Sequence, residues 1–185
     1  MNRQMVTGSL GAIAQREGKS LAETFLSAEA VVLVDTSGSM DSRDARGGRS
    51  RYETACDELA KLQNSMPGKV AVVSFSDTAV FCPTGVPEYL MGGTNLAGGL
   101  QFVQAADGLG LKIILISDGE PDIRTEALEV AKTFKSQIST IFVGPEGGAG
   151  SQFLQQLAAA CGGQAVTAQF ANQLAQTSQL LLARP

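Results

Sequence analysis

The sequence AVVLVDTSGSM, residues 30–40, joins a continuous apolar run to a turn rich in hydroxyl and carboxylate groups. The run does not alternate with polar residues, which is typical of a strand buried on both faces of a sheet. Similar short runs follow at residues 70–75, 79–82, 113–116 and 141–143, with a weaker one at 164–167. Strands of this kind belong to sheets that are covered by helices.

Segments with apolar residues at helical spacing separate most of these runs, at residues 52–65, 95–106, 123–136, 153–160 and 172–182. This alternation predicts an α/β fold: a doubly wound, Rossmann-like, mostly parallel sheet of about six strands with helices on both faces. Only Ser76, Asp77 and Thr78 connect the second and third runs. Because a parallel crossover needs a dozen or more residues, we expect an antiparallel hairpin and one antiparallel edge strand.

The chain shows no internal repeat. We expect residues 1–28 to form an N-terminal arm, loosely specified up to about residue 19, with one short helix opened by a capping box of Ser20 and Glu23. Residues 29–185 then form a single domain. The segment GPEGGAG, residues 144–150, is predicted to be a flexible loop, because it lacks the Lys-Ser/Thr that would follow in a phosphate-binding P-loop.

Composition excludes several kinds of chemistry. The 185 residues contain no histidine, which excludes Ser-His-Asp and Cys-His catalysis and histidine-ligated metals within this chain. The net charge of −4 argues against nucleic-acid binding. No apolar run is long enough to cross a membrane. The three scattered cysteines indicate free thiols in a reducing compartment, so we expect a cytoplasmic protein.

Polar side chains follow the predicted strands at the edge where ligands bind in open α/β sheets. Asp35, Ser37 and Ser39 leave the first strand, Asp118 leaves the fourth, and Thr94 follows two glycines before a helix. Carboxylate and hydroxyl oxygens suit Mg²⁺, Mn²⁺ or Ca²⁺. Two carboxylates only neutralise a divalent ion, so the ion would keep positions open for water or for a carboxylate from a partner protein.

Plainer interpretations compete for these residues. The first three side chains alone fit a turn and a helix cap. Asp122 is better placed to cap the following helix than to bind metal, and Glu120 fits either a ligand contact or a solvated loop. Ser74 is a turn residue or supports the metal loop. The segment 41–51 holds Arg43, Arg46, Arg49 and Arg51, which form either a mobile collar that steers an acidic partner or a solvated loop balanced by Asp41 and Asp44.

Together, Asp35-x-Ser37-x-Ser39, Thr94 and Asp118 resemble the metal-ion-dependent adhesion site of von Willebrand factor type A domains of the bacterial type. The surrounding words VVLVDTSGSM, KVAVVSFSD, GGTNLAGGL, IILISDGEPD and STIFVG occur in the order of that family, over about residues 29–182. The resemblance implies a bound Mg²⁺ or Mn²⁺. It implies direct ligation by Ser37, Ser39 and Thr94, and ligation by Asp35 and Asp118 directly or through water.

The resemblance also implies a function: a metal-dependent protein–protein interaction module that binds a Glu or Asp of its partner through the ion. Bacterial members of the family resemble partners of AAA+ ATPases. A refinement of the binding hypothesis is therefore that this chain is an accessory subunit of a separate AAA+ ATPase or of an assembly complex. The alternative is a Mg²⁺-dependent phosphoryl-transfer enzyme or hydrolase that uses Asp35. An aspartyl-phosphate enzyme would want a second carboxylate where Ser37 stands, and no imidazole is present as a base. We therefore expect no enzymatic activity.

Overall fold

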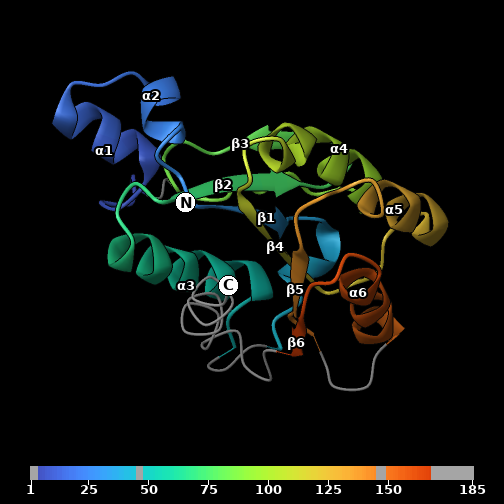
Figure 1. Ribbon diagram of the computed structural model, residues 1–185. Helices are drawn as coiled ribbons and strands as arrows, with labels where there is room; N and C mark the ends of the chain where they lie inside the picture. The colour runs from blue at the N-terminus through green and yellow to red at the C-terminus, as the bar shows by residue number, and fades with distance from the viewer. Residues whose placement is uncertain (1–3, 45–47, 145–148, 168–185) are drawn as a thin grey trace.

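The computed structural model describes residues 4–44, 48–144 and 149–167, and it contains one six-stranded sheet between layers of helices (Figure 1). The strands are β1 (Ala30–Asp35), β2 (Val70–Phe75), β3 (Ala79–Phe81), β4 (Lys112–Ser117), β5 (Ile138–Phe142) and β6 (Ala165–Thr167). The helices are α1 (Leu10–Glu17), α2 (Leu21–Phe25), α3 (Arg51–Ser65), α4 (Leu96–Asp107), α5 (Arg124–Ala131) and α6 (Ala149–Ala160), with a 3-10 helix η1 (Gly38–Asp41).

The strand order is β3-β2-β1-β4-β5-β6. Strand β3 pairs antiparallel with β2 at one edge, and the other neighbouring strands pair in parallel. The turn between β2 and β3 closes with a 2.9 Å hydrogen bond from the Ser76 N–H to the Thr78 carbonyl. The predicted fold class and the antiparallel edge strand are confirmed.

The apolar strands are buried because both faces of the sheet are covered. On β1, Val31 and Leu33 contribute to a core cluster with residues of α4, α5 and α6, while Val32 and Val34 contribute to a second cluster with residues of α3. Successive side chains of a strand point to opposite faces, so a strand between two helical layers is apolar at every position. This explains why the runs in the sequence do not alternate.

The N-terminal region differs from the loosely specified arm that we predicted. Ser9 caps α1 by accepting a hydrogen bond from the Ala12 N–H, and Leu10 is buried in the same core cluster as β1. The Gly11 N–H donates to the Pro83 carbonyl at 2.8 Å. The prediction failed because α1 is short, and its few apolar residues gain their burial from contacts distant in sequence. The predicted capping box of α2, by contrast, is present.

Two predicted helices have different limits in the structure. Helix α5 ends at Ala131 rather than at residue 136, because the N–H groups of Thr133 and Phe134 bond to carbonyls three residues back and tighten the last turn. The N–H groups of Lys135 and Ser136 then donate to the Asp107 carboxylate. Helix α6 begins at Ala149, inside the segment predicted as a glycine loop. The predicted helix at 172–182 lies outside the described residues.

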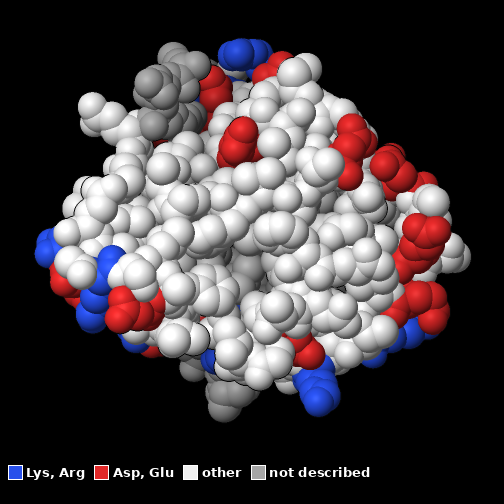
Figure 2. Space-filling model, turned by 90° about the horizontal axis from the view of Figure 1, so that it is seen from above, with Lys and Arg blue, Asp and Glu red and all other residues white. Residues whose placement is uncertain are grey.

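The surface seen from above carries its charges unevenly. Asp and Glu gather along the side where α4 and α5 lie, and Lys and Arg are confined to the margins of this face (Figure 2).

Within the described residues, no helix is both long and apolar enough to span a membrane.

Candidate metal centre

The candidate centre lies at the topological switch point of the sheet, between β1 and β4, where the strand order reverses. From β1 the chain proceeds to β2 on one side, and it later returns to place β4 on the other side. Loops that leave neighbouring parallel strands at such a switch point diverge and leave room for a ligand. Because β1 ends at Asp35 and β4 ends at Ser117, the turn of residues 35–39 and Asp118 come to this edge together.

Asp35 is fully buried and held by neutral donors. Its Oδ1 accepts a hydrogen bond from the Ser37 N–H at 2.9 Å, and its Oδ2 accepts one from the Ser117 hydroxyl at 2.6 Å. Burial raises the pKa of Asp35 to about 6, with Asp118 adding in the same direction, although the hydrogen bonds from Ser117 and Ser37 lower it. Two carboxylates thus lie close enough to repel each other, which a cation between them would relieve.

The Ser37 and Ser39 hydroxyls are hydrogen-bonded to each other, with their oxygens 3.1 Å apart. Neighbouring ligands of an octahedral Mg²⁺, each about 2.1 Å from the ion, lie about 3.0 Å apart. The two hydroxyls therefore already have the spacing of adjacent metal ligands. Ser37 is the residue before η1, yet its side chain makes no capping hydrogen bond. The helix-cap interpretation of Ser37 is therefore wrong.

Backbone hydrogen bonds tie the loop that carries Thr94 to the turn after β1. The Met91 N–H donates to the Thr36 carbonyl, and the Gly38 N–H donates to the Gly92 carbonyl, each at 3.1 Å. Met91 has φ +60°, in the left-handed region that non-glycine residues rarely adopt, and it remains 59% exposed. A strained residue next to a predicted site is a recurrent feature of functional loops. Thr94 itself is buried.

Asp122 positions the Thr94 loop and does not cap α5. Both of its carboxylate oxygens accept from the Thr94 N–H at 3.1 Å, and its own N–H donates to the Thr94 carbonyl at 3.1 Å. The N-cap position of α5 is Ile123, which makes no side-chain cap. The N-cap prediction is wrong because a tertiary partner 28 residues away outcompetes the local one. Nothing in the local sequence signals this pairing.

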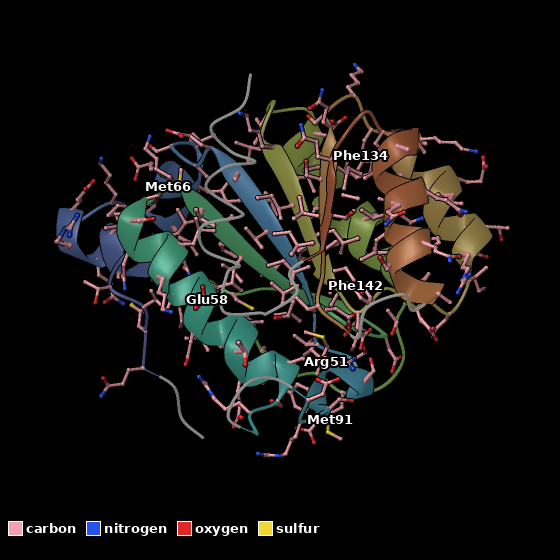
Figure 3. All side chains as sticks on the ribbon, turned by 90° about the horizontal axis from the view of Figure 1, so that it is seen from below. Arg51, Glu58, Met66, Met91, Phe134 and Phe142 are labelled. Carbon is pink, nitrogen blue, oxygen red and sulfur yellow. The ribbon has the colours of Figure 1, made fainter. Side chains whose placement is uncertain are left out.

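Asp118 is nearly buried and carries an ion pair that the motif alone does not predict. Its Oδ2 accepts a hydrogen bond from Arg51 Nη1 at 2.9 Å, and Arg51 also pairs with Asp44. Arg49 pairs with Asp57 at 2.6 Å. These two arginines are therefore bound within the chain and do not form the mobile collar that we considered; Arg46 lies outside the described residues. Figure 3 shows Arg51 toward the same end of the molecule as Met91, and Met66 at the other end of α3.

The remaining candidates lie apart from the donor set. The Ser74 hydroxyl accepts from the Glu88 N–H at 2.8 Å, so it supports a loop beside β2 rather than the metal loop. Glu120 is exposed. Cys56, Cys82 and Cys161 are not joined by disulfide bonds.

The donor chemistry fits a hard divalent ion. In the described part of the chain, no group of three or more Cys, Asp or Glu side chains could hold a metal. The candidate set instead combines two carboxylates with three hydroxyls: Asp35, Asp118, Ser37, Ser39 and Thr94. Oxygen-only sets of low negative charge suit Mg²⁺ or Mn²⁺, which keep several waters.

Comparison with known proteins identifies the fold. No family model matches this sequence, and no curated protein sequence matches it either. A solved von Willebrand factor type A protein from Catenulispora acidiphila superposes with a TM-score of 0.61 at 20% identity, over 84% of this chain and 42% of that chain. The chain has a von Willebrand factor type A-like fold.

A second solved structure has a similar fold: an aerotolerance-related membrane protein from Bacteroides fragilis, with multiple mutations to serines. Its TM-score is 0.62 at 17% identity, and the match covers 84% of this chain and 98% of that chain. At these identities both likenesses concern the type A-like fold. The case for a metal centre rests on the residues of this chain.

Proposed function

We propose that this chain is a metal-dependent protein-binding module that holds Mg²⁺ or Mn²⁺ at the carboxyl edge of its sheet. The observation that carries the proposal is the pair of Ser37 and Ser39 hydroxyls, set 3.1 Å apart beside the buried carboxylate of Asp35. Such a pair has the spacing of two adjacent metal ligands. The type A-like fold supports the same interpretation, because modules of this fold typically mediate protein interactions.

The proposed roles follow from chemistry and position. Ser37, Ser39 and Thr94 ligate the ion directly, while Asp35 and Asp118 ligate it directly or through water. When bound, the ion supplies a Lewis-acidic position that accepts one further anionic oxygen. Because only two carboxylates neutralise its charge, we propose that a Glu or Asp of a partner protein fills that position.

Turnover is the less favoured function. An aspartyl-phosphate enzyme needs a second carboxylate two residues after the first, and this chain has Ser37 at that position. The chain contains no histidine that could work as a base at neutral pH. We therefore propose a binding role without catalysis. A separate AAA+ ATPase or an assembly complex as the partner rests on the family resemblance alone.

Calorimetric titration with Mn²⁺ and Mg²⁺ tests the proposal. The wild type is expected to bind one ion and to unfold at a higher temperature with it. The double variant Ser37→Ala/Ser39→Ala is expected to lose binding and the thermal shift. Ser42→Ala is the matched control, because it removes a hydroxyl just after η1 that lies outside the donor set.

Partner capture tests the second half of the proposal. The wild type is expected to retain a partner protein from extract in Mg²⁺ and to release it in EDTA, while the double serine variant captures none. Absence of divalent-ion binding to the wild type would overturn the proposal. Magnesium-dependent hydrolysis of a generic phosphate ester, lost in Asp35→Asn, would replace it with the enzymatic alternative.

A further inference from the structure

Arg51 places a positive charge at the candidate centre. It is the first residue of α3, directly after the N-cap Ser50, and its side chain is 13% exposed. Its guanidinium spans two carboxylates: Asp118, which belongs to the donor set, and Asp44, which lies outside it. Figure 3 shows the Arg51 side chain at the end of α3 that lies near the carboxyl ends of the strands.

The two halves of this bridge are unequal. Arg51 Nε contacts both oxygens of Asp44, at 3.0 and 3.2 Å, and Nη2 makes a further bond to the same carboxylate. Only Nη1 reaches Asp118, at 2.9 Å. The guanidinium is therefore anchored on Asp44 and extends a single N–H to Asp118. It can leave Asp118 while it keeps its bonds to Asp44.

The Asp118 carboxylate cannot bind the Arg51 guanidinium and a divalent ion equally well at the same time. A divalent ion ligated by Asp118, directly or through water, lies a few ångströms from the guanidinium, in a partly buried place where like charges are weakly screened. The charge count agrees: Asp35 and Asp118 balance a divalent ion, and Asp44 balances Arg51, so the guanidinium is not needed at Asp118 once the ion is bound.

We propose that Arg51 is a built-in competitor of the metal: it holds Asp118 while the ion is absent and withdraws onto Asp44 when the ion binds. The inference rests on the proposed metal-binding function and describes its regulation. The Arg51–Asp118 pair lowers metal affinity, and metal binding is coupled to the segment that carries Asp44.

Calorimetric titration with Mn²⁺ alone tests the competition. Arg51→Gln is expected to bind Mn²⁺ about tenfold more tightly than the wild type, the size of a typical coupling between two sites. Arg49→Gln is the matched control, because Arg49 lies two residues before Arg51 and carries the same charge. Arg49 pairs with Asp57, which is not in the donor set. Its affinity is expected to stay within about twofold of the wild type.

A second pair of variants keeps Arg51 in place, should Arg51→Gln fail to fold. Asp44→Asn removes the outer anchor, so Arg51 pairs with Asp118 alone. The guanidinium then competes more strongly with the ion for Asp118, and Mn²⁺ binding is expected to weaken several-fold. Asp41→Asn removes an equivalent charge from the end of η1 without touching the bridge. It is expected to bind Mn²⁺ nearly as the wild type does.

The outcomes separate the inference from the function on which it rests. If the wild type binds Mn²⁺ and Arg51→Gln matches Arg49→Gln or binds more weakly, the competition is overturned and the metal centre stands. Equal affinities of Asp44→Asn and Asp41→Asn would overturn it as well. If neither the wild type nor Arg51→Gln binds Mn²⁺, both the centre and its competitor fall.

Discussion

The Ser117 hydroxyl on β4 donates a 2.6 Å hydrogen bond to the carboxylate of Asp35 on the adjacent strand β1, across 82 residues of sequence. A second bond, from the Ser37 N–H, holds the other oxygen. Both donors are neutral, so they orient the carboxylate without cancelling its charge. The protein thereby fixes Asp35 in place before any ion arrives, which lowers the ordering cost of binding one.

This arrangement predicts a specific pH dependence in the metal-free protein. The pKa of Asp35 is about 6 in the folded state, above its usual value of 3.8. The folded state therefore holds the extra proton more strongly, and Asp35 contributes stability that is present below pH 4 and is lost as the pH rises through 6. The loss amounts to about 3 kcal/mol in the free energy of unfolding.

Asp35→Asn isolates that contribution, because it keeps the carboxyl shape without the charge. In EDTA, the variant and the wild type are expected to have similar stability near pH 4, and the variant is expected to be more stable at pH 7. Denaturant unfolding at several pH values measures the difference. Parallel pH profiles for the two proteins would contradict the prediction.

Asp122→Ala is expected to weaken Mn²⁺ binding several-fold, although Asp122 is not a ligand. It removes the carboxylate that holds the Thr94 N–H, so the loop that carries Thr94 loses this anchor. Asp107→Ala is the control, since Asp107 also accepts from backbone N–H groups, but beyond α5. Equal metal affinities of the two variants, measured by calorimetry, would show that Asp122 does not position the loop.

Gly119→Ala is expected to cost more than about 2 kcal/mol of stability. Gly119 directly follows Asp118, has φ +86°, and a Cβ there would lie 2.4 Å from the Gly150 carbonyl oxygen. Gly110→Ala provides the comparison, because Gly110 has φ +70° and open space around it. It is expected to cost about 1 kcal/mol. Similar losses in thermal unfolding would show that the close approach to Gly150 is not what matters.

Ser50→Ala is expected to destabilise the protein by about 1 to 2 kcal/mol. Ser50 and Glu53 form a reciprocal capping box at the start of α3, and Ser50 is buried, so water cannot replace the lost bond. The same box occurs at Ser20 and Glu23 on α2, where Ser20 is exposed. Ser20→Ala is expected to cost about 0.5 kcal/mol. A larger loss at Ser20 than at Ser50, in denaturant unfolding, would refute this account.

The sheet was largely predictable from the sequence. Each apolar run became a strand because strands buried on both faces leave an unambiguous pattern, and the three-residue link at Ser76–Thr78 allowed only a hairpin. The positions of Asp35 and Asp118 followed from the strand ends. Helix α1 was missed because its stabilising contacts, such as Gly11 with Pro83, are distant in sequence.

The polar interactions around the candidate centre were less predictable. Arg51 stood out in the sequence as one of several arginines, but its choice of Asp118 depends on how α3 begins relative to β4. Asp122 carried a helix-cap signal and makes a tertiary pair instead. Local patterns report local partners, whereas a carboxylate at the end of a strand selects whichever donor the fold brings to it.

The N-terminal helices also cover the edge of the sheet that β3 forms. Strand β3 is a three-residue edge strand, and Phe25 of α2 packs edge-on against its Phe81 at 6.0 Å between ring centroids. Residues just after β3 are in turn bonded to the α1 region, through Thr84 and Pro83. A short, covered edge offers little template for pairing with a second chain. Residues 4–28 therefore cover the β3 edge against edge-to-edge self-association, and a protein that lacks residues 1–28 is expected to aggregate.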